Sequence, residues 1–223
     1  MTRSSTPRAA KPPSAQAFTR KLLAWYARTA RDLPWRRTRD PYRVLVSEFM
    51  LQQTQVSRVR EYYPRFLARF PDLEALASAR PRAVREAWDG LGYYARAANL
   101  HALARVVSRD LDGKLPDEPK QLLDLPGIGP YTAGAVASFA YEKPVPAVDT
   151  NVARVIRRVF GSAERGTRNA ELWRLAGRLV PKNGRRAWRF NQAIMELGAL
   201  VCVARKPRCP QCPVRPVCRT GKS

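Results

Sequence analysis

Apolar residues recur along most of this chain at intervals of three and four, which is the spacing of one face of an α-helix. Capping side chains or prolines precede several of these stretches, as at Asp40-Pro41. The pattern predicts helices at residues 16–31, 42–59, 62–70, 73–78, 81–88, 95–109, 119–123, 151–160, 167–180 and 186–201, with an Ala-rich helix after Gly129. No pair of alternating stretches joined by a hairpin turn is found in the sequence. We therefore predict an all-α protein of short helices and short connectors.

The predicted helix at residues 42–59 carries one carboxylate among many apolar side chains. At about 100° per residue, Glu48, Gln52 and Gln55 fall on one stripe of this helix, and Lys and Arg are missing from that stripe. Most such stripes are faces in contact with solvent. The alternative is a face that offers one acid and two amides to a functional site.

A second informative stretch runs from Leu125 to Val155. Gly127 and Gly129 form a turn that opens a helix, where backbone N–H groups can approach an anion such as a phosphate. A plain connection between two helices also uses glycine, so the turn alone is weak support for a binding site. Asp149 stands at the start of the following helix, a position that a simple N-cap would also explain.

The charge of the chain predicts a polyanionic partner. Lys and Arg number 41 against 18 Asp and Glu, which gives a net charge of +23, and the basic residues are spread over the whole chain. DNA or RNA is the first expectation and an acidic membrane surface the second. No apolar run approaches the roughly 18 residues that a membrane-spanning helix needs. We expect a cytoplasmic, nucleoid-associated protein that does not bind membranes.

The first 15 residues are basic and contain Ser and Pro, but they lack the apolar segment of a secretory signal. A transit peptide is also rich in Arg and Ser and poor in acids, but the prolines argue against an amphipathic targeting helix. We interpret residues 1–15 as a disordered basic arm that contacts DNA nonspecifically.

All four cysteines lie in the last 22 residues, separated by gaps of six, two and five: Cys202, Cys209, Cys212 and Cys218. Two disulfides are possible in principle, but nothing in the sequence suggests secretion, so a metal is favoured. Zinc sites usually show two Cys-x-x-Cys pairs. One close pair with a cysteine on either side suits a four-iron cubane better. Lys and Arg crowd the same loop, which predicts that it also contacts DNA.

Taken together, the glycine turn, Asp149 and the C-x6-C-x2-C-x5-C terminus resemble the helix–hairpin–helix DNA glycosylases of the endonuclease III type, over residues 16–218. Within that superfamily, six segments resemble the MutY-type adenine glycosylases: LPWR (33–36), DPYRVLVSEFMLQQTQV (40–56), GLGYYAR (90–96), GPYTAGAV (129–136), VDTNVARV (148–155) and FNQAIMELGALVC (190–202). The resemblance implies the helix–hairpin–helix glycosylase fold, with two helical lobes and a C-terminal [4Fe-4S] cluster loop. The expected domains are a basic arm at 1–15, a six-helix barrel at 31–139 and a cluster domain of 16–30 plus 140–223.

The resemblance also implies roles for individual residues. Glu48, which lies among apolar neighbours and is expected to have a raised pKa, would protonate the purine at N7 and then help to activate water. Asp149 would stabilise the oxocarbenium-like sugar, as a carboxylate does in glycoside hydrolysis. Tyr131 and Asn151 would orient these two carboxyl groups, and Arg36 and Glu196 would contact the flipped adenine. Gln52, Gln53 and Tyr93 would wedge the duplex, and Gly127 and Gly129 would clamp a phosphate. The four cysteines would bind the cluster.

The sequence departs from this branch at two places. The chain ends just after the cysteines, without the C-terminal domain that helps adenine glycosylases recognise 8-oxoguanine, and Thr150 replaces a glycine that is common between Asp149 and Asn151. Family members with lyase activity have a Schiff-base lysine at the position of Tyr131, so the resemblance implies a monofunctional glycosylase that leaves the abasic strand uncut.

Three functions stay open at this point. The favoured one is removal of mispaired adenine from double-stranded DNA containing a mismatch or lesion, by a monomer. The second is a G·T or G·U mismatch thymine/uracil glycosylase, a branch that also ends after the cluster and can carry Tyr at the position of Tyr131; Gln52-Gln53 and Tyr93-Tyr94 resemble the adenine branch more closely. The third is a DNA-binding module without catalysis, against which the pair Glu48 and Asp149 argues.

Overall fold

Helices form all the regular secondary structure in residues 14–161 and 170–222, which are the residues described by the computed structural model. The prediction of an all-α protein is therefore confirmed for this part of the chain. The α-helices are α1 Ala15–Thr29, α2 Pro41–Leu51, α3 Val56–Arg69, α4 Leu73–Ala77, α5 Pro81–Ala87, α6 Ala95–Asp110, α7 Pro119–Leu122, α8 Pro130–Tyr141, α9 Thr150–Phe160, α10 Ala170–Leu179 and α11 Gly184–Leu200. Short 3₁₀ helices lie at Pro34–Arg36, Cys209–Gln211, Arg215–Val217 and Thr220–Lys222.

Capping side chains set several helix starts where the sequence predicted them. The carboxylate of Asp40 accepts a 2.8 Å hydrogen bond from the backbone N–H of Arg43, and Pro41 occupies the first position of α2. Asp149 caps α9 in the same way, through the N–H of Val152. Such caps satisfy N–H groups that have no partner inside the helix. The predicted arm at residues 1–15 lies outside the described residues except for Ser14, which caps α1, and Ala15, which begins it.

The predicted helix at residues 42–59 is wrong, because the chain breaks it between Leu51 and Val56. Gln52 is extended, Gln53 adopts a left-handed backbone with φ of +54°, and Gln55 is the N-cap of α3. Glu48, Gln52 and Gln55 therefore do not share a helix face. Carbonyl groups at the end of α2 are bonded instead to the side chain of Arg96, a distant residue that no local pattern reveals. The predicted helix at 62–70 is the second half of α3, which continues through Pro64.

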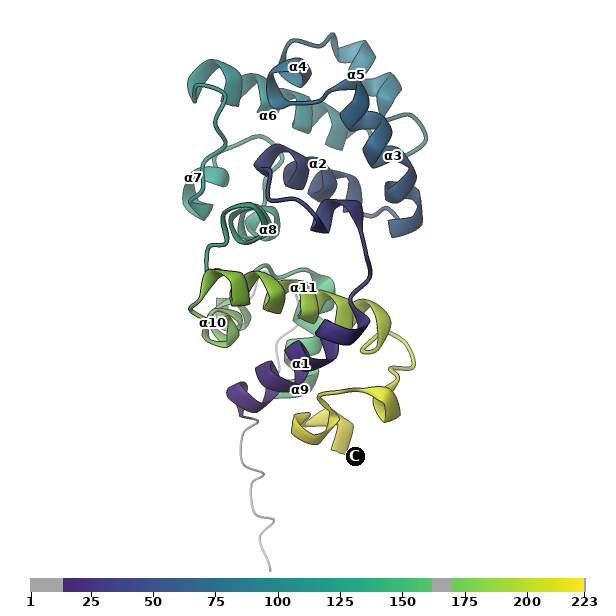
Figure 1. Ribbon diagram of the computed structural model, residues 1–223, viewed down its shortest axis with the longest axis vertical. Coiled ribbons are helices and arrows are strands. Elements are labelled where there is room, and N and C mark those ends of the chain that lie inside the picture. The colour runs from purple at the N-terminus through teal and green to yellow at the C-terminus, as the bar shows by residue number, and fades with distance from the viewer. Residues whose placement is uncertain (1–13, 162–169, 223) are drawn as a thin grey trace, which may run out of the picture.

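The buried apolar residues form two clusters. The first contains residues from Leu33 to Ala147, and the second combines residues from Phe18 to Tyr26 with residues from Val148 to Cys218. Figure 1 shows the corresponding arrangement, with α2 to α8 in the upper part and α1, α9, α10, α11 and the yellow C-terminal segment below. The domain boundaries expected from the resemblance stay a prediction, since clusters of buried side chains describe packing and not independent folding units.

The connector between α8 and α9 passes from the first cluster to the second and places Asp149. A Cβ atom on Gly134 would lie 2.2 Å from the carbonyl oxygen of Pro146, so only glycine permits this close approach. The buried amide of Asn191 in α11 donates hydrogen bonds to Ser138 Oγ at 2.8 Å and to the carbonyl of Val145 at 2.9 Å. These contacts fix the chain immediately before Asp149.

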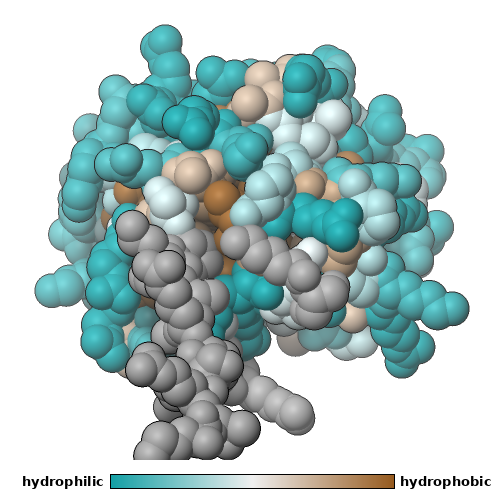
Figure 2. Space-filling model, turned by 90° about the horizontal axis from the view of Figure 1, so that it is seen from below, coloured by the Kyte–Doolittle hydropathy of each residue, from teal (hydrophilic) through white to brown (hydrophobic). Residues whose placement is uncertain are grey.

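The described surface is mainly hydrophilic at the end that carries α1 and the C-terminal segment, with small hydrophobic areas between the polar side chains (Figure 2). Within residues 14–161 and 170–222, no helix has the length and apolar character needed to cross a membrane. Part of the predicted helix at 167–180 lies outside the described residues, and the described part begins at Ala170.

Candidate active site

A cleft of about 720 Å³ opens beside α2, α8, α9 and α11. The sequence singled out seven of the residues that line it: Arg36, Glu48, Gln52, Gln53, Tyr131, Asp149 and Asn151. They come from two separate stretches of the chain, residues 36–53 and 131–151, and meet here because α2 packs on α8 and α11 packs on α9. The fold therefore gathers the predicted catalytic groups in one cavity.

Glu48 is the buried acid of this cleft, with 4% of its surface exposed. The phenol of Tyr131 donates a 2.7 Å hydrogen bond to its Oε2 atom. Burial raises the pKa of Glu48 from its ordinary value of 4.5 to about 7, and the charge of Asp149 raises it further, while the bond from Tyr131 acts in the opposite direction. The rise in pKa that the apolar neighbours predicted is confirmed, and the carboxyl group can hold a proton near neutral pH.

Asp149 is fixed by two hydrogen bonds. Its Oδ1 atom accepts from the N–H of Val152 at 2.7 Å, and its Oδ2 atom accepts from the side-chain amide of Asn151 at 2.8 Å. The amide oxygen of Asn151 accepts in turn from the guanidinium of Arg154 at 2.7 Å. The carboxylate is therefore both a helix cap and a rigidly oriented wall of the cleft, so the two roles considered for it are compatible.

The predicted pair Arg36 and Glu196 is in direct contact, but only Arg36 lines the cleft. Glu196 is fully buried, and its two oxygens accept bonds of 2.7 Å from Arg31 and 2.8 Å from Arg36. Burial opposes its charge, but the bonds from Arg31 and Arg36 outweigh that effect and lower the pKa of Glu196. Glu196 thus anchors two arginines that face the cleft. Sequence reasoning missed Arg31, because nothing near the end of α1 marks its partner in α11.

Gln192 also lines the cleft and was not singled out from the sequence. It lies in α11, 5% exposed, one helical turn before Glu196. The spacing of four residues from Glu196 within the segment 190–202 was the signal that could have found it, since residues four apart share a helix face.

The predicted wedge residues sit at the tips of two loops. Gln53 follows α2 and lines the rim of the cleft, whereas Tyr93 precedes α6, does not line the cleft and is 63% exposed. Both residues have a left-handed backbone, with φ of +54° and +47°. Such a conformation is uncommon for residues other than glycine, and it is maintained only where the surroundings impose it.

The two glycines predicted to clamp a phosphate lie at the start of α8, outside the cleft. Gly127 has φ of +75°, and a Cβ atom there would lie 2.7 Å from Cβ of Asn99. Gly129 is the extended N-cap of α8, with open space around the position of a Cβ atom. The turn thus requires glycine at position 127 for conformational reasons, and phosphate binding at both positions stays a prediction.

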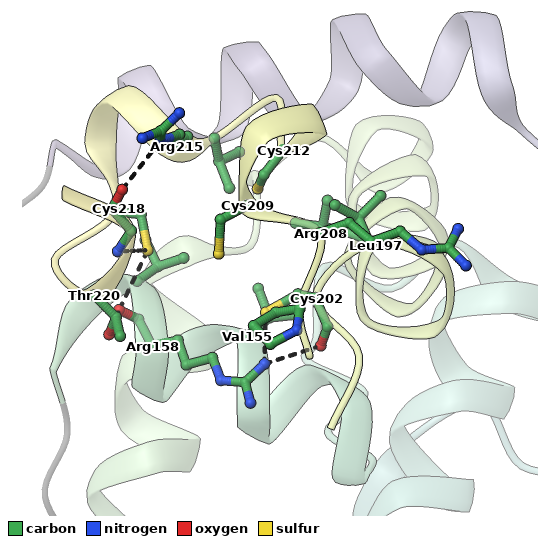
Figure 3. Close-up of a pocket in the computed structure, with 15 residues that line it drawn as sticks. Val155, Arg158, Leu197, Cys202, Arg208, Cys209, Cys212, Arg215, Cys218 and Thr220 are labelled. Carbon is green, nitrogen blue, oxygen red and sulfur yellow. Dashed lines mark hydrogen bonds between the residues drawn. The ribbon is translucent and has the colours of Figure 1, made fainter. Parts of the chain in front are cut away.

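The four cysteines surround a second, apolar cavity of about 50 Å³ next to α9 and the end of α11 (Figure 3). All four are free thiols, so the alternative of two disulfides is not supported by the structure. The N–H of Gly221 and the guanidinium of Arg158 lie 3.3 and 3.4 Å from the sulfurs of Cys218 and Cys202. Within the described part of the chain, no three His, Cys, Asp or Glu residues are arranged to hold a single metal ion. A single zinc would require all its sulfurs within about 2.3 Å of one ion, and a multi-iron cluster would not.

Comparison with known proteins adds sequence relatives to this geometry. The chain is 48% identical over 196 residues to an adenine DNA glycosylase of Mycolicibacterium smegmatis, covering 87% of this chain and 66% of that protein. An adenine DNA glycosylase of Rattus norvegicus is 46% identical over 215 residues, 91% of this chain and 41% of the relative. The chain thus spans less than two thirds of these relatives. A thymine-DNA glycosylase of Aeropyrum pernix is 38% identical over 208 residues, 91% of this chain and 93% of the relative.

Solved structures agree on the fold. A thermostable thymine-DNA glycosylase superposes with a TM-score of 0.87 at 34% identity, covering 93% of this chain and 96% of that one. Endonuclease III in a complex with DNA superposes with a TM-score of 0.79 at 23% identity, covering 94% and 97%. The family model described as "HhH-GPD superfamily base excision DNA repair protein" matches residues 46–180. The chain therefore belongs to the HhH-GPD superfamily of base excision DNA repair proteins.

Proposed function

We propose that this chain is a monofunctional DNA glycosylase that removes adenine mispaired with 8-oxoguanine or guanine in double-stranded DNA. The observation that carries the proposal is Glu48, a buried carboxyl group with a pKa of about 7 in a cleft large enough for a base. Enzymes that protonate a leaving group at neutral pH need an acid with such a pKa. The choice of adenine rests on the relatives named adenine DNA glycosylase, at 46–48% identity.

In the proposed reaction Glu48 donates its proton to N7 of a flipped adenine. The bond between N9 and C1′ then breaks, and its electron pair leaves with the base. Water adds to C1′ and its proton passes to the Glu48 carboxylate, which restores the acid. Tyr131 holds the carboxyl group in place through the 2.7 Å hydrogen bond to Oε2. A positioned general acid of this kind contributes about 10²- to 10⁴-fold to a rate.

The Asp149 carboxylate supports the same step from across the cleft. Positive charge develops on the sugar as the base leaves, and a preoriented carboxylate stabilises it without further reorganisation. The hydrogen bonds from Val152 and Asn151 provide that orientation. Arg36, held by Glu196, is the proposed contact for the edge of the base.

The absence of lyase activity follows in this proposal from the residues around the site. Tyr131 occupies the position that the resemblance assigns to a Schiff-base lysine, and its hydroxyl group is engaged with Glu48. No lysine is found among the described residues that line the cleft. The product would then be an intact strand with an abasic site.

We also propose that Cys202, Cys209, Cys212 and Cys218 hold a [4Fe-4S] cluster. The residues fit this group, because four free thiols and an apolar lining of Val155, Val159, Leu197, Val201 and Val214 enclose one cavity. When bound, the cluster supplies a redox-active crosslink of the C-terminal loop. Arg158 donates to the carbonyls of Val203 and Ala204, and so ties this loop to α9.

The proposed partner is double-stranded DNA bound by one copy of the chain. The net charge of +23 favours a polyanion, and the backbone N–H groups near Gly127 and Gly129 at the start of α8 suit a phosphate without reading sequence. Flipping the base costs a few kcal/mol, which the wedge residues Gln52, Gln53 and Tyr93 would offset by filling the gap.

One observation favours a second candidate, a mismatch glycosylase that removes thymine or uracil opposite guanine. The thymine-DNA glycosylase of Aeropyrum pernix is 38% identical to this chain over 208 residues, and a thermostable thymine-DNA glycosylase superposes with a TM-score of 0.87.

Single-turnover excision on a panel of labelled duplexes separates the two candidates. The panel contains A opposite 8-oxoguanine, A opposite G, T or U opposite G, and an A·T control, each with and without alkali. Cleavage at adenine that depends on alkali supports the proposal. Cleavage at T or U alone would assign the chain to the mismatch branch, and cleavage without alkali would contradict the monofunctional mechanism.

A further inference from the structure

Arg96 is a buried arginine in the first turn of α6, with 7% of its surface exposed. Its guanidinium donates to six acceptors of two loops: the carbonyls of Phe49 (3.0 Å), Met50 (2.8 Å) and Gln52, Thr54 Oγ1 (3.0 Å), and the carbonyls of Leu91 (3.1 Å) and Gly92 (3.0 Å). None of these acceptors carries a charge. The terminal nitrogens of this buried cation are thus hydrogen-bonded, while its Nε atom is buried without a hydrogen-bond partner among the described residues.

Both terminal nitrogens of Arg96 take part in the contact with the loops. One nitrogen bonds the carbonyls of Phe49, Met50 and Gln52 at the end of α2. The other bonds Thr54 Oγ1 of the same loop together with the carbonyls of Leu91 and Gly92 in the turn before α6. The planar fork of arginine sets the distance between these two groups of acceptors. Arg96 is therefore a direct bridge between two loops that are about 40 residues apart in sequence.

These loops are the ones that carry Gln53 and Tyr93, each with a left-handed backbone. Each strained residue stands immediately after a carbonyl that Arg96 binds, namely that of Gln52 or of Gly92. The guanidinium also lies 5.7 Å from the centre of the Tyr93 ring and 5.5 Å from that of the buried Trp88. Arg96 thus contacts the backbone of both loops and also the side chain of Tyr93.

We propose that Arg96 is a positioning residue that locks the loops of Gln53 and Tyr93 into one rigid wedge, so that both enter the duplex together when a base is flipped. This proposal rests on the proposed function in that it requires DNA with a flipped base, but it does not require that the base be adenine. Arg96 itself touches neither the base nor the cleft.

The test measures unstacking of the duplex separately from excision. The probe is a duplex with 8-oxoguanine opposite a 2′-fluoro-deoxyadenosine, whose glycosidic bond resists cleavage because fluorine destabilises the sugar cation. A 2-aminopurine next to it fluoresces when stacking is lost. Stopped-flow traces are recorded for the wild-type protein, Arg96→Lys, Tyr93→Ala and the double variant, with Arg105→Lys as the control, since Arg105 is an exposed arginine of the same helix. Melting temperatures and far-UV circular dichroism confirm that each variant is folded.

Lysine keeps the positive charge but has one nitrogen with three donors, so it cannot bond all six acceptors of the two loops at once. We expect Arg96→Lys to slow unstacking by about 10- to 100-fold, the size of effect that misplacement by about 1 Å produces. In the Tyr93→Ala background the same substitution is expected to have little further effect, because contacting residues that act as one unit are not additive. Arg105→Lys should behave as the wild-type protein does.

Unstacking at the wild-type rate in a folded Arg96→Lys protein would overturn the proposal. An equal loss in the presence and absence of Tyr93 would also overturn it, since Arg96 would then act independently of the wedge. If Arg96→Lys does not fold, Arg96→Gln, which keeps two donors on one nitrogen, takes its place with the same expected outcome. A wild-type protein that unstacks this duplex but excises no adenine from the unmodified one would contradict the proposed function and leave the role of Arg96 supported.

Discussion

The phenol of Tyr131 donates a 2.7 Å hydrogen bond to Oε2 of Glu48, a carboxyl group with 4% of its surface exposed. Burial raises the pKa of Glu48 most strongly and the charge of Asp149 raises it further, while this bond lowers it, and the balance is a pKa of about 7. A stronger hydrogen bond from Tyr131 would lower the pKa of Glu48 further and leave the carboxyl group ionised at neutral pH. Without this bond the pKa would be higher, and Glu48 would donate its proton less readily. The relationship therefore sets the pH range in which Glu48 can act as an acid.

The excision rate is expected to fall above pH 7. Glu48 acts in its protonated form, and above its pKa of about 7 the protonated fraction decreases tenfold for each pH unit. Single-turnover rates on A opposite 8-oxoguanine between pH 5 and pH 9 check this prediction. A rate that increases through pH 7 to a plateau would mean that the ionised carboxylate is the active form.

Tyr131→Phe is expected to move that alkaline decrease to higher pH. The substitution removes the hydrogen bond that lowers the pKa of Glu48, so the carboxyl group stays protonated further into the alkaline range. Tyr141→Phe is a matched control, since the phenol of Tyr141 bonds the carbonyl of Leu115 far from the cleft. The excision rate of each variant is measured as a function of pH. Identical profiles for the two variants would show that Tyr131 does not alter the pKa of Glu48.

Glu48→Gln should abolish excision and stabilise the free protein at alkaline pH. The pKa of Glu48 is about 7 in the folded state against an ordinary 4.5, so between these values the folded state binds more protons than the unfolded state. Stability therefore decreases as the pH rises through this window, and the glutamine variant, which has no charge to bury, avoids the loss. We expect it to be more stable than the wild-type protein by about 1–3 kcal/mol at pH 8, and nearly equal to it at pH 4.

Urea unfolding of both proteins at the two pH values measures this difference. Glu61→Gln serves as the control, because Glu61 is an exposed carboxylate of α3 that faces Arg65. A variant that is less stable than the wild-type protein at pH 8 would contradict the unfavourable burial of charge at position 48.

Features encoded by adjacent residues could be predicted from the sequence. The caps at Asp40 and Asp149 use a side chain and an N–H three residues later, so each is visible in a short segment. The burial of Glu48 followed from the apolar residues around it. In each of these cases the interaction that matters is local.

The contacts that shape the cleft could not be predicted in the same way, because their partners are distant in sequence. The bonds of Arg96 to Phe49 and Met50 span 47 and 46 positions and end α2 where the hydrophobic pattern continues. The bonds of Arg31 to Glu196 span 165 positions. A long cation can select any of many acceptors, and only the folded chain determines which ones it meets.

Cys209→Ser is expected to remove the visible absorbance of the proposed cluster and to weaken binding to DNA. A serine hydroxyl is a poorer ligand of iron than a thiolate, so the loop of residues 202–218 would lose its crosslink. Absorbance spectra and DNA titrations at two salt concentrations measure the two effects. Unchanged binding in the absence of the cluster would mean that the loop does not depend on it.

Arg154→Met is expected to reduce excision without moving its pH dependence. Arg154 donates to Oδ1 of Asn151 at 2.7 Å and to the carbonyls of Gly198 at 2.7 Å and Cys202 at 2.8 Å. Because the amide of Asn151 orients Asp149, loss of Arg154 frees the carboxylate that stabilises the sugar. Burial and the hydrogen bond from Tyr131, which have the largest effects on the pKa of Glu48, are retained. A decrease of about 10- to 100-fold is expected from such a loss of orientation.

Arg174→Met on α10 removes an exposed arginine of equal charge and should leave the rate unchanged, which separates this effect from the general attraction to DNA. The two variants are compared in single-turnover excision at several pH values. An equal decrease of the excision rate in both variants would mean that Arg154 contributes only its positive charge. A lower excision rate in Arg154→Met alone, with an unchanged apparent pKa of the pH profile, is the expected result. It would mean that one side chain, Arg154, positions both the loop carrying Cys202 and the carboxylate of Asp149.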